Sequence, residues 1–313
     1  MSLQRHGFTS PIRYPGGKAA LSNFIKLVLF KNNLLDGHYV EVYAGGAGIA
    51  WPLLFEEYVK YVSINDISKP VCAFWQSVLQ NTEELCRLIN DTPVTIQEWH
   101  RQRSIQLRPD GCSSLELGFS NFFLNRTNWS GILQAGVIGG KGQSGKWKID
   151  ARFNKKDLIQ RIQRIAYYAG RVRLYNLDAF DFINTTLPTL SKKAIVYLDP
   201  PYYMKSQELY ENHYSHNDHV KLASLIPIQI KQPWIVSYDY CPQVTALYGQ
   251  YRSIRYNLSY SAQERYLGSE IMFFSHSIVI PATEQRSDNF SNQSTGEFIH
   301  PTRVKRSDLF LSM

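Results

Sequence analysis

The stretch HYVEVYAGGAG, residues 38–48, runs from an apolar strand pattern directly into a glycine turn. The following GIAWPLLFEEYVK, residues 48–60, predicts a helix with Pro52 in its first turn. A second strand is predicted over residues 61–64, and Asn65 and Asp66 come directly after it. This order is typical of a nucleotide-binding βαβ unit, in which the acid accepts hydrogen bonds from ribose hydroxyls. The spacing is not GxGxxG and there is no Walker lysine, so a phosphate-binding loop is disfavoured, and a plain tight turn is the alternative.

Composition bounds the classes of protein that this chain can belong to. The 313 residues are 44% hydrophobic, which is enough for one large domain or for a domain with a sizeable insertion. A net charge of +8 favours a polyanionic partner, although a merely basic soluble enzyme is the alternative. The four cysteines form no CxxC pair, so we expect reduced thiols in a cytoplasmic protein rather than disulfides or a zinc site. No signal peptide and no run of about 18 apolar residues is found, so no membrane association is expected.

The rest of the chain alternates between helical and strand patterns. Helical periodicity covers residues 70–105 and 157–170, and strands are predicted at 171–178, 194–201 and 233–239. Residues 251–260 and 269–280 are expected to form an antiparallel strand pair. Between the helical stretches, residues 124–156 are rich in glycine and basic residues, and 137–150 predict a hairpin with the tip GGKGQSGK. We therefore expect an α/β sheet that is interrupted by an insertion, with a loose polar tail beyond residue 281.

The second informative stretch is VYLDPPYY, residues 196–203, at the end of a predicted strand. Proline has no N–H and holds its preceding neighbour extended, so the carbonyls of Asp199 and Pro200 can point away from the sheet. With the Asp199 carboxylate they form a row of acceptors, and Tyr202 adds a flat ring. Acceptors beside a stacking surface suit a planar group that bears an amine, such as adenine or cytosine. A simple strand end with a proline turn is the alternative, but it does not explain the acid and the tyrosines.

A third motif, RYPGGKAAL at residues 13–21, places Lys18 after a glycine pair at the start of a helix. Taken alone, it is compatible with a solvated lysine in an ordinary turn. In the order YPGGK, AGGAG, basic insertion and DPPY, however, the chain resembles the Dam-like DNA adenine-N6 methyltransferases over residues 8–280. That family is the α group of amino-methyltransferases that use S-adenosylmethionine.

The resemblance implies a Rossmann-like class I methyltransferase sheet with helices on both faces and an antiparallel C-terminal strand pair. It implies a catalytic domain formed by residues 1–79 and 166–281, an inserted target-recognition domain at 80–165 that is mostly helical with a β-hairpin, and a flexible tail at 282–313. Two departures affect the cofactor geometry, because Val42-Tyr43 stands where many relatives have Pro-Phe and Leu177 replaces a frequent glycine.

The resemblance also assigns site residues. The catalytic residues that it implies are Asp199, Pro200, Pro201 and Tyr202. The cofactor contacts that it implies are Tyr14, Lys18, Glu41, Tyr43, Ala44, Gly45, Gly46, Gly48, Asp66, Ile67, Asp178, Ala179 and again Asp199. Within this set, residues 41–48 surround the methionine moiety, Asp66 holds the ribose, and Asp178 binds the adenine amine of the cofactor.

The insertion is expected to contact double-stranded DNA. NRTNWSG, residues 125–131, resembles the family segment near the target base, and the hairpin carries lysines that can neutralise phosphates. The DNA-binding residues that we expect are Asn125, Arg126, Asn128, Lys141, Lys146, Lys148 and Arg152. Trp129 and Trp147 can stack or wedge, although tryptophan is more often part of a core. The resemblance also allows a restriction endonuclease partner, whereas the sequence gives no indication of oligomeric state.

The expected reaction is direct methyl transfer to adenine N6 after the base has left the duplex stack. Hydrogen bonds from the amine to Asp199 and Pro200 would localise the nitrogen lone pair, and no covalent enzyme intermediate is needed. The alternatives are an RNA adenine-N6 methyltransferase, a cytosine-N4 enzyme (these more often carry SPPY) and a catalytically silent DNA-binding protein. His213, His216 and His219 lack a carboxylate or cysteine that would complete a metal site, so no metal is predicted.

Overall fold

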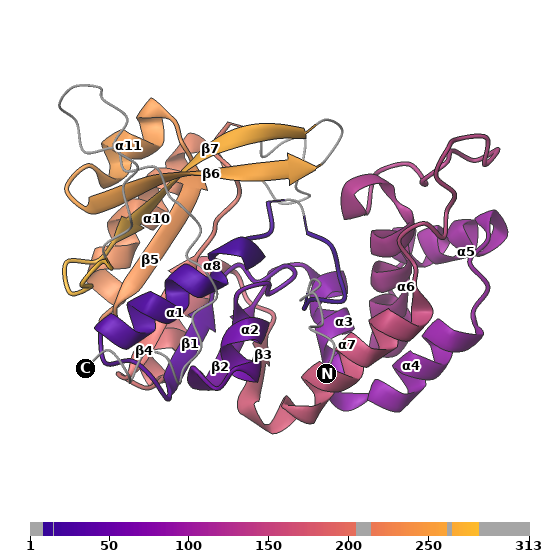
Figure 1. Ribbon diagram of the computed structural model, residues 1–313, viewed down its shortest axis with the longest axis horizontal. Coiled ribbons are helices and arrows are strands. Elements are labelled where there is room, and N and C mark those ends of the chain that lie inside the picture. Colours follow the sequence, from indigo (N-terminus) through magenta and orange to yellow (C-terminus); the bar gives the residue numbers. More distant parts are fainter. Residues whose placement is uncertain (1–8, 15, 205–213, 262–264, 282–313) are drawn as a thin grey trace, which may run out of the picture.

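A seven-stranded sheet forms the centre of the molecule (Figure 1). The computed structural model describes residues 9–14, 16–204, 214–261 and 265–281. The strand order is β3-β2-β1-β4-β5-β7-β6, in which β1 to β5 are parallel and β7 pairs antiparallel with both β5 and β6. The strands are β1 (Gly37–Glu41), β2 (Val59–Asn65), β3 (Val172–Tyr175), β4 (Ala194–Leu198), β5 (Trp234–Asp239), β6 (Arg252–Ser261) and β7 (Arg265–Phe274). The α/β fold and the antiparallel C-terminal pair predicted from the sequence are confirmed.

Helices cover both faces of this sheet because its central strands are apolar on both sides. Every residue of β1 and of β4 is buried. Successive side chains of a strand point to opposite faces, so Tyr39 joins one hydrophobic cluster and Val40 joins the other. The first cluster includes α1 (Ser22–Lys31), α2 (Ala50–Phe55) and α3 (Lys69–Gln80), and the second includes α10 (His216–Gln229) and α11 (Pro242–Tyr248). Single turns are α8 (Ala179–Asp181), η1 (Ala19–Leu21), η2 (Trp129–Gly131), η3 (Ala169–Arg171), η4 (Phe182–Thr186) and η5 (Leu187–Thr189).

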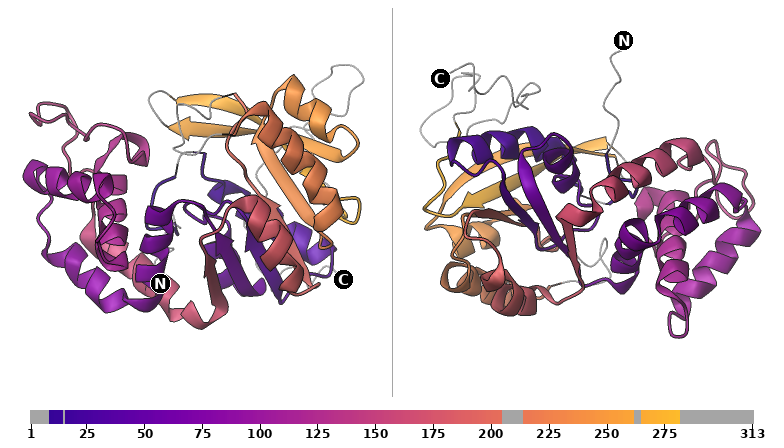
Figure 2. Two further views of the ribbon diagram at one scale, coloured as in Figure 1. Left: turned by 180° about the vertical axis from the view of Figure 1, so that it is seen from behind. Right: turned by 90° about the horizontal axis from the view of Figure 1, so that it is seen from below.

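The insertion is a group of helices at one end of the sheet (Figures 1 and 2). It contains α4 (Thr82–Asp91), α5 (Ile96–Leu107), α6 (Ser114–Thr127) and α7 (Lys155–Tyr167). Ser113 and Glu116 form a capping box that starts α6. Helix α3 joins the insertion to the sheet, because the ring of Phe74 stacks on Phe122 of α6 with centroids 5.6 Å apart. The same hydrophobic cluster therefore continues from the sheet into the insertion.

The hairpin predicted at residues 137–150 is not formed. The segment is a succession of turns, and only an isolated bridge between Asn128 and Val137 has the strand geometry. The side chain of Gln143 takes the place of a strand ladder, since it donates to the carbonyls of Ile138 and Gly140 and accepts from the backbone N–H of Ile149. Gly139 and Gly140 have φ of 85° and 74°, a conformation that interrupts an extended strand.

The remaining expectations concern the tail, the histidines, the cysteines and membrane spans. The predicted tail from residue 282 lies outside the described residues, and so does His213. Cys72 and Cys241 are buried, Cys86 and Cys112 are partly buried, and all four are unpaired. Among the helices that the structure describes, none is long and apolar enough to cross a membrane.

Gly118 should be required for the packing of α6 on α3. A Cβ at this position would lie 2.5 Å from the Ala73 carbonyl oxygen and 2.8 Å from the Phe74 Cα. Alanine normally favours a helix over glycine by about 0.5–1 kcal/mol, but backbone overlap reverses the sign here. We expect Gly118→Ala to lower the free energy of unfolding by about 1–3 kcal/mol in urea denaturation. Gly170→Ala is the control, because nothing lies within 4 Å of its added Cβ; equal stability of both variants would contradict this packing.

Candidate active site

The glycine turn and the DPPY corner lie side by side at one edge of the sheet. Strands β1 and β4 are parallel neighbours, so their carboxyl ends meet at that edge. Glu41 pairs with Tyr197 in the strand register, which brings the turn at 44–48 next to the corner at 199–202. Crevices at the carboxyl ends of parallel strands are the common ligand sites of such sheets.

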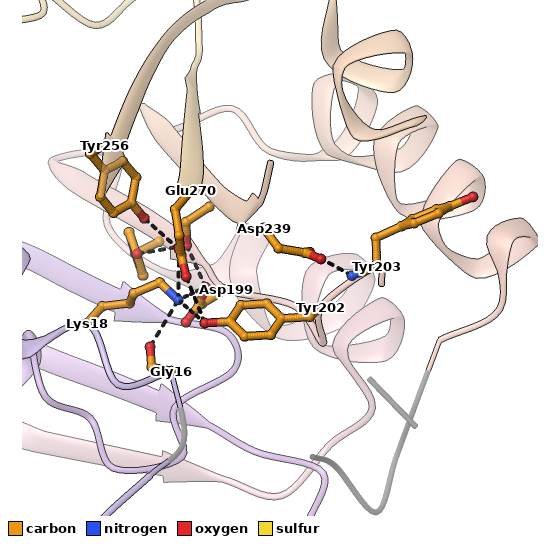
Figure 3. A network of polar contacts seen from close by, with 10 residues as sticks. Gly16, Lys18, Asp199, Tyr202, Tyr203, Asp239, Tyr256 and Glu270 are labelled. Carbon is orange, nitrogen blue, oxygen red and sulfur yellow. Dashed lines mark hydrogen bonds and ion pairs between the residues drawn. The ribbon is translucent and has the colours of Figure 1, made fainter. Parts of the chain in front are cut away.

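A buried ammonium group joins three distant parts of the chain at this edge (Figure 3). Lys18 Nζ lies 3.1 Å from Asp199 Oδ1 and 3.2 Å from Glu270 Oε2. It also donates to the Gly16 carbonyl at 3.0 Å and to the Tyr202 hydroxyl at 3.2 Å. Lys18 is thus not the solvated lysine of an ordinary helix start, because its side chain is only 3% exposed.

The two oxygens of Asp199 have different surroundings. Oδ1 accepts from Ser237 Oγ at 2.6 Å and faces Lys18, and the Tyr197 hydroxyl lies 2.8 Å from the same Ser237 oxygen. No hydrogen bond within the described part of the chain reaches Oδ2 or the Pro200 carbonyl oxygen. The Asp199 side chain is 21% exposed. The corner therefore presents two acceptors that no group of the described residues occupies.

The tyrosines of the corner are both held in place. The Tyr202 hydroxyl donates to Glu270 Oε1 at 2.7 Å, and Lys18 lies 5.0 Å from the centre of its ring. The backbone N–H groups of Tyr203 and Met204 donate to the carboxylate of Asp239 at the end of β5. Tyr203 itself packs against His219, with ring centroids 5.0 Å apart, behind the corner. These contacts fix the rigid DPPYY backbone in one position.

The electrostatics of this cluster follow from its burial. Burial alone would lower the pKa of Lys18, but Asp199 and then Glu270 outweigh it, so that the pKa lies well above its ordinary value. Burial raises the pKa of Glu270, Lys18 opposes the shift and Asp199 adds to it. The pKa values of Tyr197 and Tyr256 are also raised well above their ordinary value, mainly by burial. Lys18 is therefore a fixed cation, and the two tyrosines stay neutral hydrogen-bond donors.

The glycine turn is shaped by backbone contacts. Gly45 has a φ of 47° and donates its N–H to Asp66 Oδ2 at 2.8 Å, while Asp66 Oδ1 accepts from the Ser68 N–H. Burial raises the pKa of Asp66, and these two hydrogen bonds oppose the shift. A Cβ on Gly45 would lie 2.8 Å from the ring of Tyr14, which packs over the turn. A side chain at residue 45 would thus displace Tyr14.

Several of the predicted cofactor contacts surround this turn. Ala44, Gly46 and Gly48 form the turn with Gly45, and Gly48 packs against Ala19 of the N-terminal segment. Tyr43 bonds through its hydroxyl to Tyr214 at 3.0 Å, and Phe180 stacks on the same Tyr214. Asp178 caps α8 by accepting from the Phe180 N–H, Ala179 is buried, and Ile67 is exposed.

Glu41 provides a test of whether these residues fit S-adenosylmethionine. Its Oε2 atom is buried and has no hydrogen-bond partner among the described residues. Burial, and then the charge of Asp199, raises the pKa of this carboxyl well above its ordinary value. A cationic ligand beside Glu41 would satisfy this oxygen, and S-adenosylmethionine carries both an ammonium and a sulfonium group. The donor set is therefore compatible with the cofactor that the sequence predicts.

A family model for D12 class N6 adenine-specific DNA methyltransferases matches residues 14–262. The chain belongs to this family. The match includes the Lys18 segment, the glycine turn, the insertion and the DPPY corner, and it confirms the family that the sequence motifs predict. The cofactor is accordingly S-adenosylmethionine, as the sequence predicts, and the methyl acceptor of the family is the N6 amine of adenine. A comparison with curated proteins gave no significant match.

Solved structures give only a distant likeness to this methyltransferase. One is a protein of Pyrococcus horikoshii proposed to be an RNA methyltransferase, with 9% identity, a TM-score of 0.41, and coverage of 88% of this chain and 92% of that chain. Another is the rRNA methyltransferase AviRa of Streptomyces viridochromogenes, with 12% identity, a TM-score of 0.34, and coverage of 84% and 87%. At these values the likeness does not bear on the substrate.

The insertion residues predicted to bind DNA fall into two groups. Asn125 and Asn128 are buried, and their amides hold the protein's own backbone. Asn125 accepts from the Arg13 N–H and donates to the carbonyls of Arg13 and Gly131, whereas Asn128 accepts from Trp99 and donates to the Ile132 and Leu133 carbonyls. Direct DNA contact by these two side chains is therefore not supported.

The second group is cationic. Arg126 is buried and its Nε atom has no partner among the described residues. Burial, followed by the charges of Arg161 and Arg13, lowers the pKa of Arg126 to about 9. We call Arg126, Arg161 and Arg13 the arginine group. An anion bound beside it would reduce the repulsion between these three guanidinium charges. The other predicted DNA contacts, Lys141, Lys146, Lys148 and Arg152, are exposed cations.

Trp129 and Trp147 of the insertion are not core residues. Trp129 is 48% exposed and Trp147 is 58% exposed. Trp129 follows the buried Asn128, so the structural amides of the segment present this ring at the surface. Both rings can therefore stack on a ligand, and the alternative that they belong to the core is wrong.

Sequence reasoning missed Glu270, Tyr256, Ser237 and Asp239 as parts of the site. The sequence predicts a strand over residues 233–239 but assigns no site role to Ser237 or Asp239 within it. The residues on either side of Glu270, Ser269 and Ile271, form no recognisable motif with it. An acid within an apolar strand was the one available signal, because a buried carboxylate requires a partner.

Asp66 should be required for cofactor binding. In Asp66→Asn the amide nitrogen faces one of the two backbone N–H donors, so the turn loses a charge-assisted hydrogen bond. Because such bonds contribute about 1.5–3 kcal/mol, we expect binding of S-adenosylhomocysteine to weaken by roughly 10- to 100-fold in calorimetry. Asp110→Asn, at an exposed acid in the turn before α6, is the matched control and should bind like the wild type. Unchanged affinity of Asp66→Asn would show that this acid does not support the cofactor site.

Proposed function

We propose that the protein methylates the N6 amine of adenine within a specific sequence of double-stranded DNA. The observation that supports this most directly is the DPPY corner, where no described residue donates to Asp199 Oδ2 or to the Pro200 carbonyl. Two acceptors on a rigid backbone match the two N–H groups of an exocyclic amine. The description of the family adds adenine and DNA to this geometry.

The residues of the corner would activate a poor nucleophile. The lone pair of an adenine amine is delocalised into the ring, and acceptors at both N–H groups favour a nitrogen with a localised pair. When bound, S-adenosylmethionine supplies the methyl group as an electrophilic carbon. The amine nitrogen gains positive charge during the reaction, and the carboxylate of Asp199 and the Pro200 carbonyl are already oriented to stabilise it. Pro201 keeps the corner rigid, and the hydroxyl of Tyr202 is held by Glu270.

Double-stranded DNA is favoured over RNA by the family and by the surface of the insertion. The exposed cations at residues 141–152 and the arginine group at Arg126 can neutralise phosphates. The exposed ring of Trp129 can fill the gap that a displaced base leaves. Because a stacked base cannot reach the corner, base flipping is part of the proposal. Methyl transfer to duplex DNA should exceed transfer to structured RNA, and the reverse ratio would favour an RNA methyltransferase.

A catalytically silent DNA-binding protein is less well supported. The acceptors of the corner, the Lys18 ion pairs and the hydrogen-bonded glycine turn are all present together. Burying these charges costs free energy, and a protein that only binds DNA has no evident need for them.

Asp199 should be required for the reaction. In Asp199→Ala one of the two amine acceptors is lost, and we expect methyl transfer to duplex DNA to fall by at least about 10²–10³-fold. Modification-sensitive sequencing of DNA from a host that expresses the wild type identifies the modified base and its sequence. Transfer of labelled methyl groups to a duplex with that sequence then gives the rates of both proteins. Asp110→Ala is the control, and normal transfer by Asp199→Ala would refute the assignment.

The insertion lysines should contribute to DNA affinity through phosphates. For Lys141→Ala with Lys146→Ala we expect weaker binding and a slope of log K against log salt that is smaller by about 0.9 per lost contact. Fluorescence anisotropy of a labelled duplex over a salt series measures this slope. Lys192→Ala is the control, since this exposed lysine precedes β4 at the opposite edge of the sheet. An unchanged slope in the double variant would exclude these lysines from the interface.

A further inference from the structure

Glu270 is a buried carboxylate of the site that lies outside the residues matched by the family model. Its side chain is 1% exposed, and both oxygens are engaged. Oε1 accepts from the Tyr202 hydroxyl, and Oε2 accepts from the Tyr256 hydroxyl at 2.9 Å and faces Lys18 (Figure 3). A carboxylate is rarely buried to this extent unless it is paired.

The position of Glu270 follows from the register of the antiparallel pair. Glu270 of β7 lies between Asp239 of β5 and Tyr256 of β6. Its side chain points to the face that also holds Met272, and this is the face that α1 and the N-terminal segment cover. The strand pair that ends the described chain is therefore connected to the catalytic corner through Lys18.

The charges of the cluster do not balance. Lys18 contributes one positive charge, whereas Asp199 and Glu270 each contribute one negative charge. The tyrosines that face Glu270, Tyr202 and Tyr256, are hydrogen-bond donors to it. With one cation shared between two carboxylates, the cluster keeps a net negative charge.

We propose that Glu270 is a positioning residue that shares Lys18 with Asp199 and so keeps the corner negatively charged when the amine reacts. Without Glu270, Lys18 would pair with Asp199 alone, and this one-to-one ion pair would neutralise the acceptor. The nitrogen that becomes positively charged would then meet a neutral pair instead of a negative cluster. Glu270 also fixes the Tyr202 hydroxyl, which keeps the ring of Tyr202 against the corner. This inference rests on the proposed methyl transfer to adenine.

The test compares Glu270→Gln with a double variant that restores the charge. Glu270→Gln makes the cluster neutral, and Lys18→Met with Glu270→Gln returns it to one negative charge. We expect the single-turnover methyl-transfer rate of Glu270→Gln to fall on the order of 10- to 100-fold, and the double variant to be faster than the single one. The affinity of Glu270→Gln for S-adenosylhomocysteine, measured by calorimetry, should stay within about threefold of the wild-type value. The substitution slows the reaction and leaves the cofactor site unchanged. If Glu270 only supports the fold, the second substitution adds damage and the double variant is slower or equal.

A substitution that leaves the charge of Glu270 in place gives an independent readout. Tyr256→Phe removes one hydrogen bond to Glu270 without changing the charge of the cluster. Its methyl-transfer rate should therefore stay closer to that of the wild type than the rate of Glu270→Gln does, whereas a purely structural role predicts comparable losses from both substitutions.

The outcomes separate this role from the proposed function. A wild-type protein that transfers no methyl group to adenine would count against the function itself. An active wild type with a double variant no faster than Glu270→Gln would overturn the role of Glu270 alone. If Glu270→Gln does not fold, Lys18→Met and the double variant provide the comparison. Because Glu270 acts through Lys18, its removal from Lys18→Met should leave the methyl-transfer rate nearly unchanged, and a further fall of about 10-fold or more refutes the proposal.

Discussion

The ammonium group of Lys18 is the interaction on which the arrangement of this protein depends. It is buried, and it reaches the N-terminal turn, the DPPY corner and the C-terminal strand pair at once. Burying one charge in a protein interior costs several kcal/mol unless its partners are in place, so these three segments stabilise the site only as a group. The start of the chain and its last described strands are thereby fixed against the middle, although more than 250 residues separate Lys18 from Glu270.

The period of two along each strand explains why this cluster assembles on one face. Tyr197, near the end of β4, and Asp199, just after it, are two residues apart. Ser237 lies on the neighbouring β5, and Glu270 lies on β7. Alternate residues of these strands, such as Ile235 and Met272, join the hydrophobic cluster beneath α1. Helix α1, which follows Lys18, packs on that same cluster through its apolar side chains. This packing positions Lys18 at the polar edge of the sheet.

The insertion contains polar residues with structural roles that residue types alone do not reveal. Asn125 and Asn128 resemble contact residues in sequence, but their amides hold the backbone that carries Trp129 at the surface. The hairpin at 137–150 was predicted from glycines at a turn, yet Gln143 satisfies the backbone groups that a strand ladder would use. Such choices depend on competition between side-chain and backbone hydrogen bonds, which local propensity does not report.

The sequence by itself determined the α/β order, the glycine turn, the acid at the end of β2 and the DPPY corner, because each depends on local restrictions of glycine, proline and strand periodicity. The order of these motifs was also sufficient to indicate the family. Only the tertiary structure decided that Lys18 is buried, that Asp239 holds the backbone after Tyr202, and that Glu270 shares the cation with Asp199. These contacts join residues from different strands, and the free energy of a buried charge depends on the partners that the completed fold places around it.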